Sequence, residues 1–181
     1  VAFDFAMNGY SLTVGKADQF VPGVSGNALY FDGTYAADFS SPYADESAVS
    51  ASSLSLWVRF DDYSDKMSVV SRLFGNQDGP SVIYDDSIDA LTVNYSLLGD
   101  PAGELAVTGF SAIYPIGQWH HLAVVFDHQN GVFIYLNGQQ VAVGQVNGTS
   151  LFANGGWPAQ LGGSNGSWLL KGAIDDVRLY G

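Results

Sequence analysis

Of the 18 acidic residues in this chain only two, Glu46 and Glu104, are glutamates, and they lie far apart in the sequence. Hydrolysis of a glycosidic bond needs two carboxyl groups that flank the bond. Adjacent pairs such as Asp61-Asp62 and Asp175-Asp176 would point to opposite faces of a strand. The carboxylates therefore favour turn formation or Ca²⁺ binding over catalysis.

The histidines give a weak signal for metal binding or catalysis. On a strand, the side chains of His120 and His121 point to opposite faces, so the two cannot share one metal ion. On a strand, His121 lies on the same face as Trp119 and Val125. This pattern is more typical of a packed structural histidine. The sequence contains no G-x-S-x-G, H-E-x-x-H, phosphate-loop or dinucleotide motif and no cysteine. We therefore predict that the protein is not an enzyme.

One segment has the side chains that bind sugars. Between residues 53 and 60, apolar residues alternate with Ser53, Ser55, Trp57 and Arg59. Small serines would leave a trough on the sheet, the indole would stack on a sugar ring, and the guanidinium would donate to hydroxyl groups. We predict that these side chains form a ligand site on a concave sheet, flanked by Arg72, Asn94, Trp157 and Trp168. A serine-lined sheet face without a ligand is the alternative.

The elements that must position these residues are short strands. Apolar and polar residues alternate along most of the chain, and clusters of Gly, Asn, Asp and Pro separate the runs. Asn137-Gly138 and Gln129-Asn130-Gly131 predict hairpin turns. Strands are predicted at residues 27–31, 36–39, 53–60, 68–74, 81–84, 91–95, 103–107, 119–127, 131–136, 139–143, 159–161 and 173–180, with further strand-like sequence at 1–5. The pattern predicts an all-β fold, a two-sheet antiparallel jelly-roll β-sandwich, as a single domain over residues 1–181.

The composition limits the possible partners. Charged residues make up 13% of the chain, and the formal net charge is -12. This charge repels nucleic acid and anionic membrane surfaces, so we predict neither as a partner. No apolar run reaches the ~18 residues of a membrane-spanning helix, and no membrane insertion is expected. The charge favours a neutral ligand, unless Arg59 or Arg72 binds an acidic group locally.

Five segments resemble, in the same order, motifs of laminin-G-like, concanavalin A-like jelly rolls. The segments are GVSGNALYFDG (23–33), LSLWV (54–58), WHHLAVVFD (119–127), IYLNG (134–138) and GAIDDVRLY (172–180). They span nearly the whole chain, so the resemblance implies a concanavalin A-like fold. That fold hosts lectins, carbohydrate-binding modules, glycosidases, lyases and protein-binding modules. The E-x-D-x-x-E motif of its glycosidases is absent here.

The resemblance also implies a calcium ion. Alternation along the last strand places Asp175 on the same face as Val177 and Leu179, where an unpaired charge is very costly. Asp175 therefore needs a cation or several backbone N–H groups. Similar domains hold Ca²⁺ between the N-terminal segment and the last strand, and the resemblance assigns Asp175 as a ligand. Further candidate ligands are Asp32, Asp176 and Asp4; alternatively, Asp32 caps a turn and Asp176 is solvated.

We interpret the chain as a non-catalytic carbohydrate-binding module, lectin-like and stabilised by calcium. The resemblance implies that such a module is appended to a secreted bacterial polysaccharide-degrading enzyme, so it would lie outside the cell or at its surface. Its partners would be a poly- or oligosaccharide and the other domains of a larger parent protein. A protein-binding or structural spacer module of a cell-surface protein is the alternative. A small polysaccharide lyase with a Tyr or His base is the weaker one.

Overall fold

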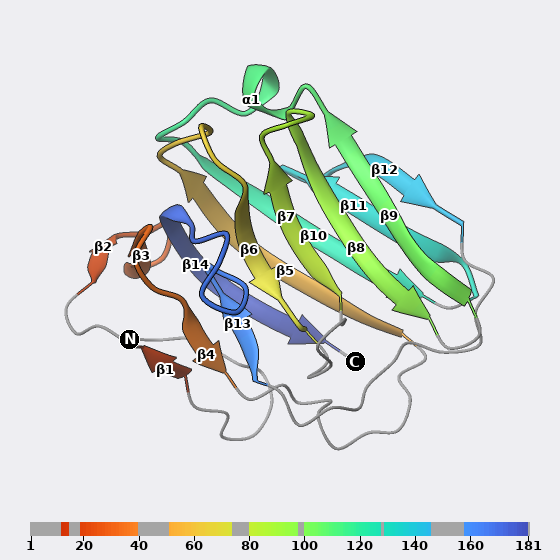
Figure 1. Cartoon of the computed structure of the whole chain (residues 1–181), viewed down its shortest axis with the longest axis horizontal. Helices are drawn as coiled ribbons and strands as arrows, with labels where there is room; N and C mark the ends of the chain where they lie inside the picture. Colours follow the sequence, from red (N-terminus) through yellow and green to blue (C-terminus); the bar gives the residue numbers. More distant parts are fainter. Residues whose placement is uncertain are drawn as a thin grey trace.

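The computed structural model describes residues 12–14, 19–39, 51–73, 80–97, 100–127, 129–145 and 158–180. They form two antiparallel sheets that pack face to face (Figure 1). Sheet A contains, in spatial order, β1 (Leu12–Val14), β4 (Ala37–Phe39), β13 (Ala159–Leu161), β6 (Met67–Ser71), β7 (Ser81–Asp85), β8 (Ala90–Leu97) and β9 (Asp100–Thr108). Sheet B contains β12 (Gln139–Gly144), β11 (Gly131–Leu136), β10 (Trp119–Asp127), β5 (Ala51–Phe60), β14 (Lys171–Tyr180), β3 (Asn27–Asp32) and β2 (Phe20–Pro22). The predicted all-β antiparallel sandwich is confirmed.

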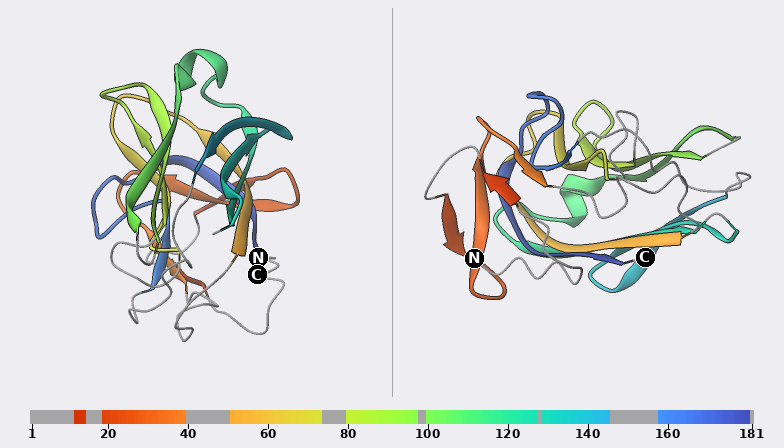
Figure 2. Two further views of the ribbon diagram at one scale, coloured as in Figure 1. Left: turned by 90° about the vertical axis from the view of Figure 1, so that its right-hand side faces the viewer. Right: turned by 90° about the horizontal axis from the view of Figure 1, so that it is seen from below.

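The hydrophobic core lies between the two sheets, which Figure 2 shows as separate layers. β5 demonstrates how alternation builds this core. Leu54, Leu56, Val58 and Phe60 are fully buried, whereas the residues between them are half-buried on the outer face of sheet B. Each fully buried aliphatic or aromatic side chain stabilises the fold by roughly 1.5–3 kcal/mol. The sequence pattern therefore predicts correctly which face of β5 points inward.

The last strand lies in the middle of sheet B. β14 pairs with β5 on one side and with β3 on the other. In Figure 1 it runs from the loop that follows β13 toward the far end of the sandwich. Because both edges of β14 are paired, a substitution that displaces its backbone also disturbs β3 and β5.

A β-bulge in β14 changes the faces that the sequence predicts. Pairing with β5 shifts between Asp175 and Arg178, and Asp176 takes the left-handed conformation with φ 47. The bulge places Ile174 and Val177 in the core, whereas Asp175 pairs with Trp57 on the outer face. The prediction that Asp175 shares the face of Val177 and Leu179 is therefore wrong, because the extra residue of a bulge interrupts alternation.

Three short elements are not predicted from the sequence. β1 and β2 are three-residue edge strands, and α1 (Phe110–Ile113) is a single helical turn. The predicted strand 68–74 ends at Ser71, because Arg72 adopts a left-handed φ of 55. The strand-like segment 1–5 lies outside the described residues. No helix in the described part of the chain is long and apolar enough to cross a membrane.

Candidate ligand-binding site

A tight hairpin connects β13 to β14. The backbone N–H of Ser164 donates to the carbonyl of Ser167 at 2.9 Å, and Ser167 donates back at 2.8 Å. Between them, Asn165 and Gly166 have φ angles of 51 and 74. Two central residues with positive φ are characteristic of a type I′ turn, for which Asn-Gly is the preferred sequence. The turn therefore has one well-defined conformation, which the local sequence specifies.

Sheet A holds this hairpin in place. Ser68 donates its backbone N–H to the carbonyl of Trp168 at 2.7 Å, and Ser71 Oγ donates to the carbonyl of Gly163 at 2.8 Å. Arg72 donates from a guanidinium nitrogen to Asn165 Oδ1 at 3.0 Å. Trp168 itself has a φ of 51, a conformation that bulky residues rarely adopt unless their surroundings impose it. The backbone contacts thus fix the position from which the indole projects.

Trp168 lines an open groove of about 400 Å³, which we call the rim groove. The groove lies where the β3–β4 turn, the β5–β6 loop and the β13–β14 hairpin meet. Its lining residues are Gly33, Asp65, Lys66, Gly166, Ser167, Trp168, Leu169 and Lys171. The volume of the groove is that of a small-molecule site. Trp168 is 43% exposed. An exposed indole in a concave site is suited to stacking on a flat ligand.

Lys66 supports the indole electrostatically. Its Nζ lies 4.9 Å from the centroid of the Trp168 ring and 2.6 Å from Asp85 Oδ2. The ammonium group is attracted to the π face, and the ion pair restrains the ammonium group in turn. The hydrogen bond from Lys66 lowers the pKa of the Asp85 carboxyl. The Trp168 ring is therefore oriented before any ligand arrives, which reduces the entropic cost of binding.

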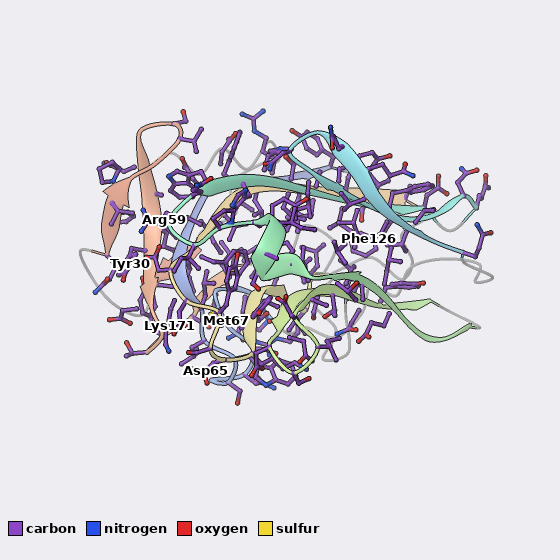
Figure 3. All side chains as sticks on the ribbon, turned by 90° about the horizontal axis from the view of Figure 1, so that it is seen from above. Tyr30, Arg59, Asp65, Met67, Phe126 and Lys171 are labelled. Carbon is purple, nitrogen blue, oxygen red and sulfur yellow. The ribbon has the colours of Figure 1, made fainter. Side chains whose placement is uncertain are left out.

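Lys171 is the second lysine of the rim groove, and it is also paired with carboxylates. Its Nζ donates to Asp62 at 2.9 Å and to Asp65 at 3.1 Å, and Figure 3 shows Lys171 and Asp65 on the same side of the molecule. These hydrogen bonds lower the pKa of Asp62 and raise that of Lys171. The lysines of the groove are thus paired with carboxylates. The site offers charged donors and acceptors without an excess of positive charge, which favours a neutral, hydroxyl-rich ligand over an acidic one.

We expect binding in the rim groove to be constant between about pH 4 and 8 and to weaken only at still lower pH. The pKa values of Asp62 and Asp85 are lowered in the folded protein, so both ion pairs persist above the ordinary carboxyl pKa of about 3.9 and are lost as the pH falls through the lowered values. Dissociation constants measured by fluorescence titration from pH 3 to 8 test this. A midpoint near pH 6 to 7 would contradict the assignment of these carboxylates.

The sequence-predicted residues Ser55, Trp57 and Arg59 lie on the outer face of sheet B. Ser55 Oγ is 3.0 Å from His121 Nε2, and the Trp57 and His121 rings make an edge contact at 5.2 Å. Arg59 donates twice to Asp61, at 2.8 and 3.0 Å, and lies over the Trp119 ring at 5.6 Å. These side chains share one face of β5. The Arg59 guanidinium uses two of its N–H donors on Asp61.

The other predicted residues lie elsewhere. Asn94 is on β8 of sheet A, opposite Ser81 and Glu104, and Trp157 lies outside the described residues. Arg72 is only 4% exposed; burial lowers its pKa, and its guanidinium holds the hairpin that carries Trp168. The prediction of one groove with Trp57, Arg72, Asn94 and Trp168 together is wrong, because β5 belongs to sheet B, whereas Asn94 lies on β8 of sheet A and Arg72 directly follows β6 of that sheet.

The predicted calcium ligands do not gather around one point among the described residues. Asp175 is 4% exposed and accepts backbone N–H groups of Ser25 and Asp176, both at 2.9 Å. Asp32 accepts from Thr34 in a turn, and Asp176 pairs with Arg178. Asp32 lies opposite Lys171, four residues from Asp175 along β14, which corresponds to about 13 Å. Asp4 lies outside the described residues.

The described carboxylates therefore do not form a complete calcium shell. Ca²⁺ takes six to eight oxygens at 2.3–2.6 Å, and no group of three or more His, Asp or Glu suited to a metal occurs in the described ranges. The Asp175 carboxylate is stabilised by two N–H donors, which is one of the two alternatives left open by the sequence. These two donors leave part of the acceptor capacity of the carboxylate unused within the described residues.

Sequence reasoning found Trp168 but missed its neighbours in the rim groove. Asp65, Lys66 and Lys171 come from segments far apart in the chain, and only the pairing of β14 with β3 and the course of the β5–β6 loop bring them together. One local signal was available. Asn165-Gly166 between two serines predicts a hairpin, and a hairpin immediately before Trp168 would hold that indole at the surface.

Similar solved structures share the fold at low sequence identity. Domain 4 of AbnA, a GH43 extracellular arabinanase from Geobacillus stearothermophilus in complex with arabinotriose, matches with a TM-score of 0.64 and 21% identity, covering 94% of this chain and 81% of that chain. The binding domain of botulinum neurotoxin DC in complex with SialylT matches with a TM-score of 0.67 and 13% identity, covering 95% and 42%. Mouse laminin α1 domains LG4-5 match with a TM-score of 0.61 and 16% identity, covering 83% and 40%.

The chain thus spans less than half of the toxin and laminin structures. No curated protein matches its sequence. The family model described as the concanavalin A-like lectin/glucanases superfamily matches residues 31–181, most of the chain. This match and the two antiparallel sheets confirm the resemblance seen in the sequence motifs. The chain belongs to the concanavalin A-like lectin/glucanase superfamily.

Proposed function

We propose that this chain is a non-catalytic module that binds a neutral glycan in the rim groove. The observation that carries the proposal is Trp168, an exposed indole held in a fixed orientation by the backbone of its hairpin and by Lys66. A pyranose or furanose ring presents a C–H face to an aromatic ring and hydroxyl groups at its edge. Trp168 supplies the platform, and Asp65, Lys66 and Lys171 supply acceptors and donors around it.

The chemistry of the groove supports a neutral glycan in particular. Its two lysines are already bound to Asp62, Asp65 and Asp85, and the chain carries a formal net charge of -12. An acidic sugar would have to displace these pairs against the field of the whole protein. Solved relatives of the same fold are described in complex with arabinotriose and with SialylT, which supports a carbohydrate as the ligand class.

The biological setting follows from this proposal. A module that binds a polysaccharide without cleaving it serves to hold a catalytic domain at its substrate, so we propose a secreted or cell-surface bacterial parent protein that degrades polysaccharides. Other domains of that parent would then be its covalent partners. The extracellular arabinanase of which the similar domain 4 is a part supports this arrangement. A spacer module and a small lyase remain the alternatives, and the binding experiment separates them.

Affinity electrophoresis tests the proposed function. The protein is run in native gels that contain arabinan, xylan, laminarin, galactomannan or hydroxyethylcellulose, with polygalacturonate as the acidic comparison. We expect retardation by at least one neutral polymer and little by polygalacturonate. Absence of retardation in every neutral gel would contradict the proposal and favour a spacer module. Absorbance of unsaturated products near 235 nm, appearing on incubation with polygalacturonate, would instead support a lyase.

We also propose that Ca²⁺ stabilises the fold, with Asp175 as one of its ligands. An ion that binds only the folded state stabilises it by about 2.7 kcal/mol at a hundredfold excess over its Kd. EDTA should therefore lower the Tm of the wild-type protein. Asp175→Asn, which keeps the shape of the side chain, should lower the Tm in calcium and abolish the effect of EDTA. An identical Tm of the wild type with EDTA and with calcium would rule the ion out.

A further inference from the structure

A second hollow lies on the outer face of sheet B, where β5 begins. It has a volume of about 200 Å³, and its lining residues are Ala51, Ser52, Ser53, Val125, Asp127 and Tyr180. Strand register explains its shape: Ser53 on β5 pairs with Val125 on β10 and with Tyr180 on β14. The small serine leaves a depression between two larger neighbours. This part of the serine trough predicted from the sequence is therefore present, at the end of β5 away from Trp57.

The side chains around this hollow have the chemistry that contacts a sugar. Tyr180 is 43% exposed and offers an aromatic face with a hydroxyl group at its tip. Ser53, on the outer face of β5, adds its hydroxyl group to the hollow beside this ring. Aromatic surface beside a hydroxyl group favours a polyol over an apolar molecule.

The hollow and the rim groove lie at opposite ends of β14. Lys171 begins the strand at the rim groove, and Tyr180 ends it at the hollow, as the course of β14 in Figure 1 shows. Nine residue steps of extended strand correspond to about 30 Å. This separation is too large for one trisaccharide to contact both sites. It is short enough for two segments of one polysaccharide, or two neighbouring chains, to occupy both at once.

We propose that the domain binds neutral polysaccharide at two sites, with the Tyr180 hollow as a weaker second site for one sugar unit. The hollow has about half the volume of the rim groove, so it accommodates fewer sugar units. Two linked binding events raise the apparent affinity for a polymer without changing the affinity for a short oligosaccharide. The proposal rests on the proposed glycan-binding function, but it concerns a separate surface and separate residues.

Two single variants and their combination test the second site in the same five neutral polysaccharide gels. We expect Tyr180→Ala to weaken retardation at least threefold in any gel that retards the wild type. Binding of the corresponding trisaccharide to the rim groove should stay within twofold. Tyr180→Ala combined with Trp168→Ala should lose all retardation. Tyr135→Ala is the matched control, because Tyr135 lies on the outer face of the same sheet, on β11, but outside the hollow.

Amide shifts of the wild-type protein provide a readout that does not depend on a variant. Titration with trisaccharides of the five polymers should shift Ser53, Val125 and Tyr180 at higher concentrations than the residues of the rim groove. Equal retardation of Tyr180→Ala, Tyr135→Ala and wild type would overturn the second site. If, in addition, only Trp168→Ala lost binding, the proposed function would still hold. Absence of retardation of the wild type in all five gels would contradict both proposals.

Discussion

Trp168→Ala is expected to weaken binding of a neutral trisaccharide at least tenfold and to change the Tm by less than about 2 °C. The substitution removes the stacking platform of the rim groove, and a tenfold loss corresponds to about 1.4 kcal/mol, which an aromatic contact with its buried area can supply. The backbone carbonyl of Trp168, which anchors the hairpin to Ser68, remains in place. Isothermal titration with arabinotriose, xylotriose and laminaritriose, together with thermal melting, provides both numbers.

Trp57→Ala is the matched control for this prediction. Trp57 is half-buried, and it lies on the outer face of sheet B against His121. Its removal should leave trisaccharide binding in the rim groove unchanged. Trp168→Phe should retain part of the affinity, because a smaller aromatic ring still stacks. Equal losses in Trp57→Ala and Trp168→Ala would assign the site to sheet B rather than to the rim groove.

Gly172→Ala is expected to destabilise the fold by at least about 3 kcal/mol, a large part of the 5–15 kcal/mol that stabilises a typical domain. A Cβ atom at this position would lie 2.0 Å from the carbonyl oxygen of Arg59 and 3.1 Å from its carbonyl carbon. Both atoms belong to the backbone of β5, so neither can rotate away, and β14 and β5 would have to separate at the centre of sheet B. Urea denaturation followed by tryptophan fluorescence measures the change.

Gly117→Ala is the control that separates this clash from the general effect of losing a glycine. Gly117 has a φ of 76, and a Cβ there would meet no atom within 4 Å. Its substitution should cost only the strain of a left-handed residue, about 1–2 kcal/mol. Similar losses in the two variants would show that the close approach of β14 to β5 does not limit which residue position 172 accepts.

Alternation along the chain was sufficient to predict most of the fold. The strand around Leu54, Leu56, Val58 and Phe60 follows the strict period of two, and its buried face is the predicted one. The prediction fails at β14, where Asp176 forms a bulge and moves Asp175 to the outer face. A single residue in a left-handed conformation changes the face of the residues that follow it, and hydrophobic alternation alone does not report that conformation.

The candidate site was harder to predict than the fold. Trp168 stood out because it follows a loop of small polar residues, but Lys66 and Lys171 reach it only through the pairing of distant strands. Arg72 was expected to contact a ligand, and instead it is buried and holds Asn165. Residue type and spacing identify side chains with suitable chemistry. Which of them meet depends on the sheet to which each strand belongs, and that information lies in long-range pairing.

The most direct test of glycan binding in the rim groove follows the indole N–H resonances of the tryptophans during titration with neutral trisaccharides. Trp168→Phe assigns one of these resonances by its disappearance. We predict that the Trp168 resonance of the wild type shifts and saturates with at least one of arabinotriose, xylotriose, laminaritriose, mannotriose and cellotriose, and that the Trp57 and Trp119 resonances move little. Saturable shifts of backbone amides with an unmoved Trp168 indole would contradict glycan binding in the rim groove, as would the absence of any shift with all five trisaccharides.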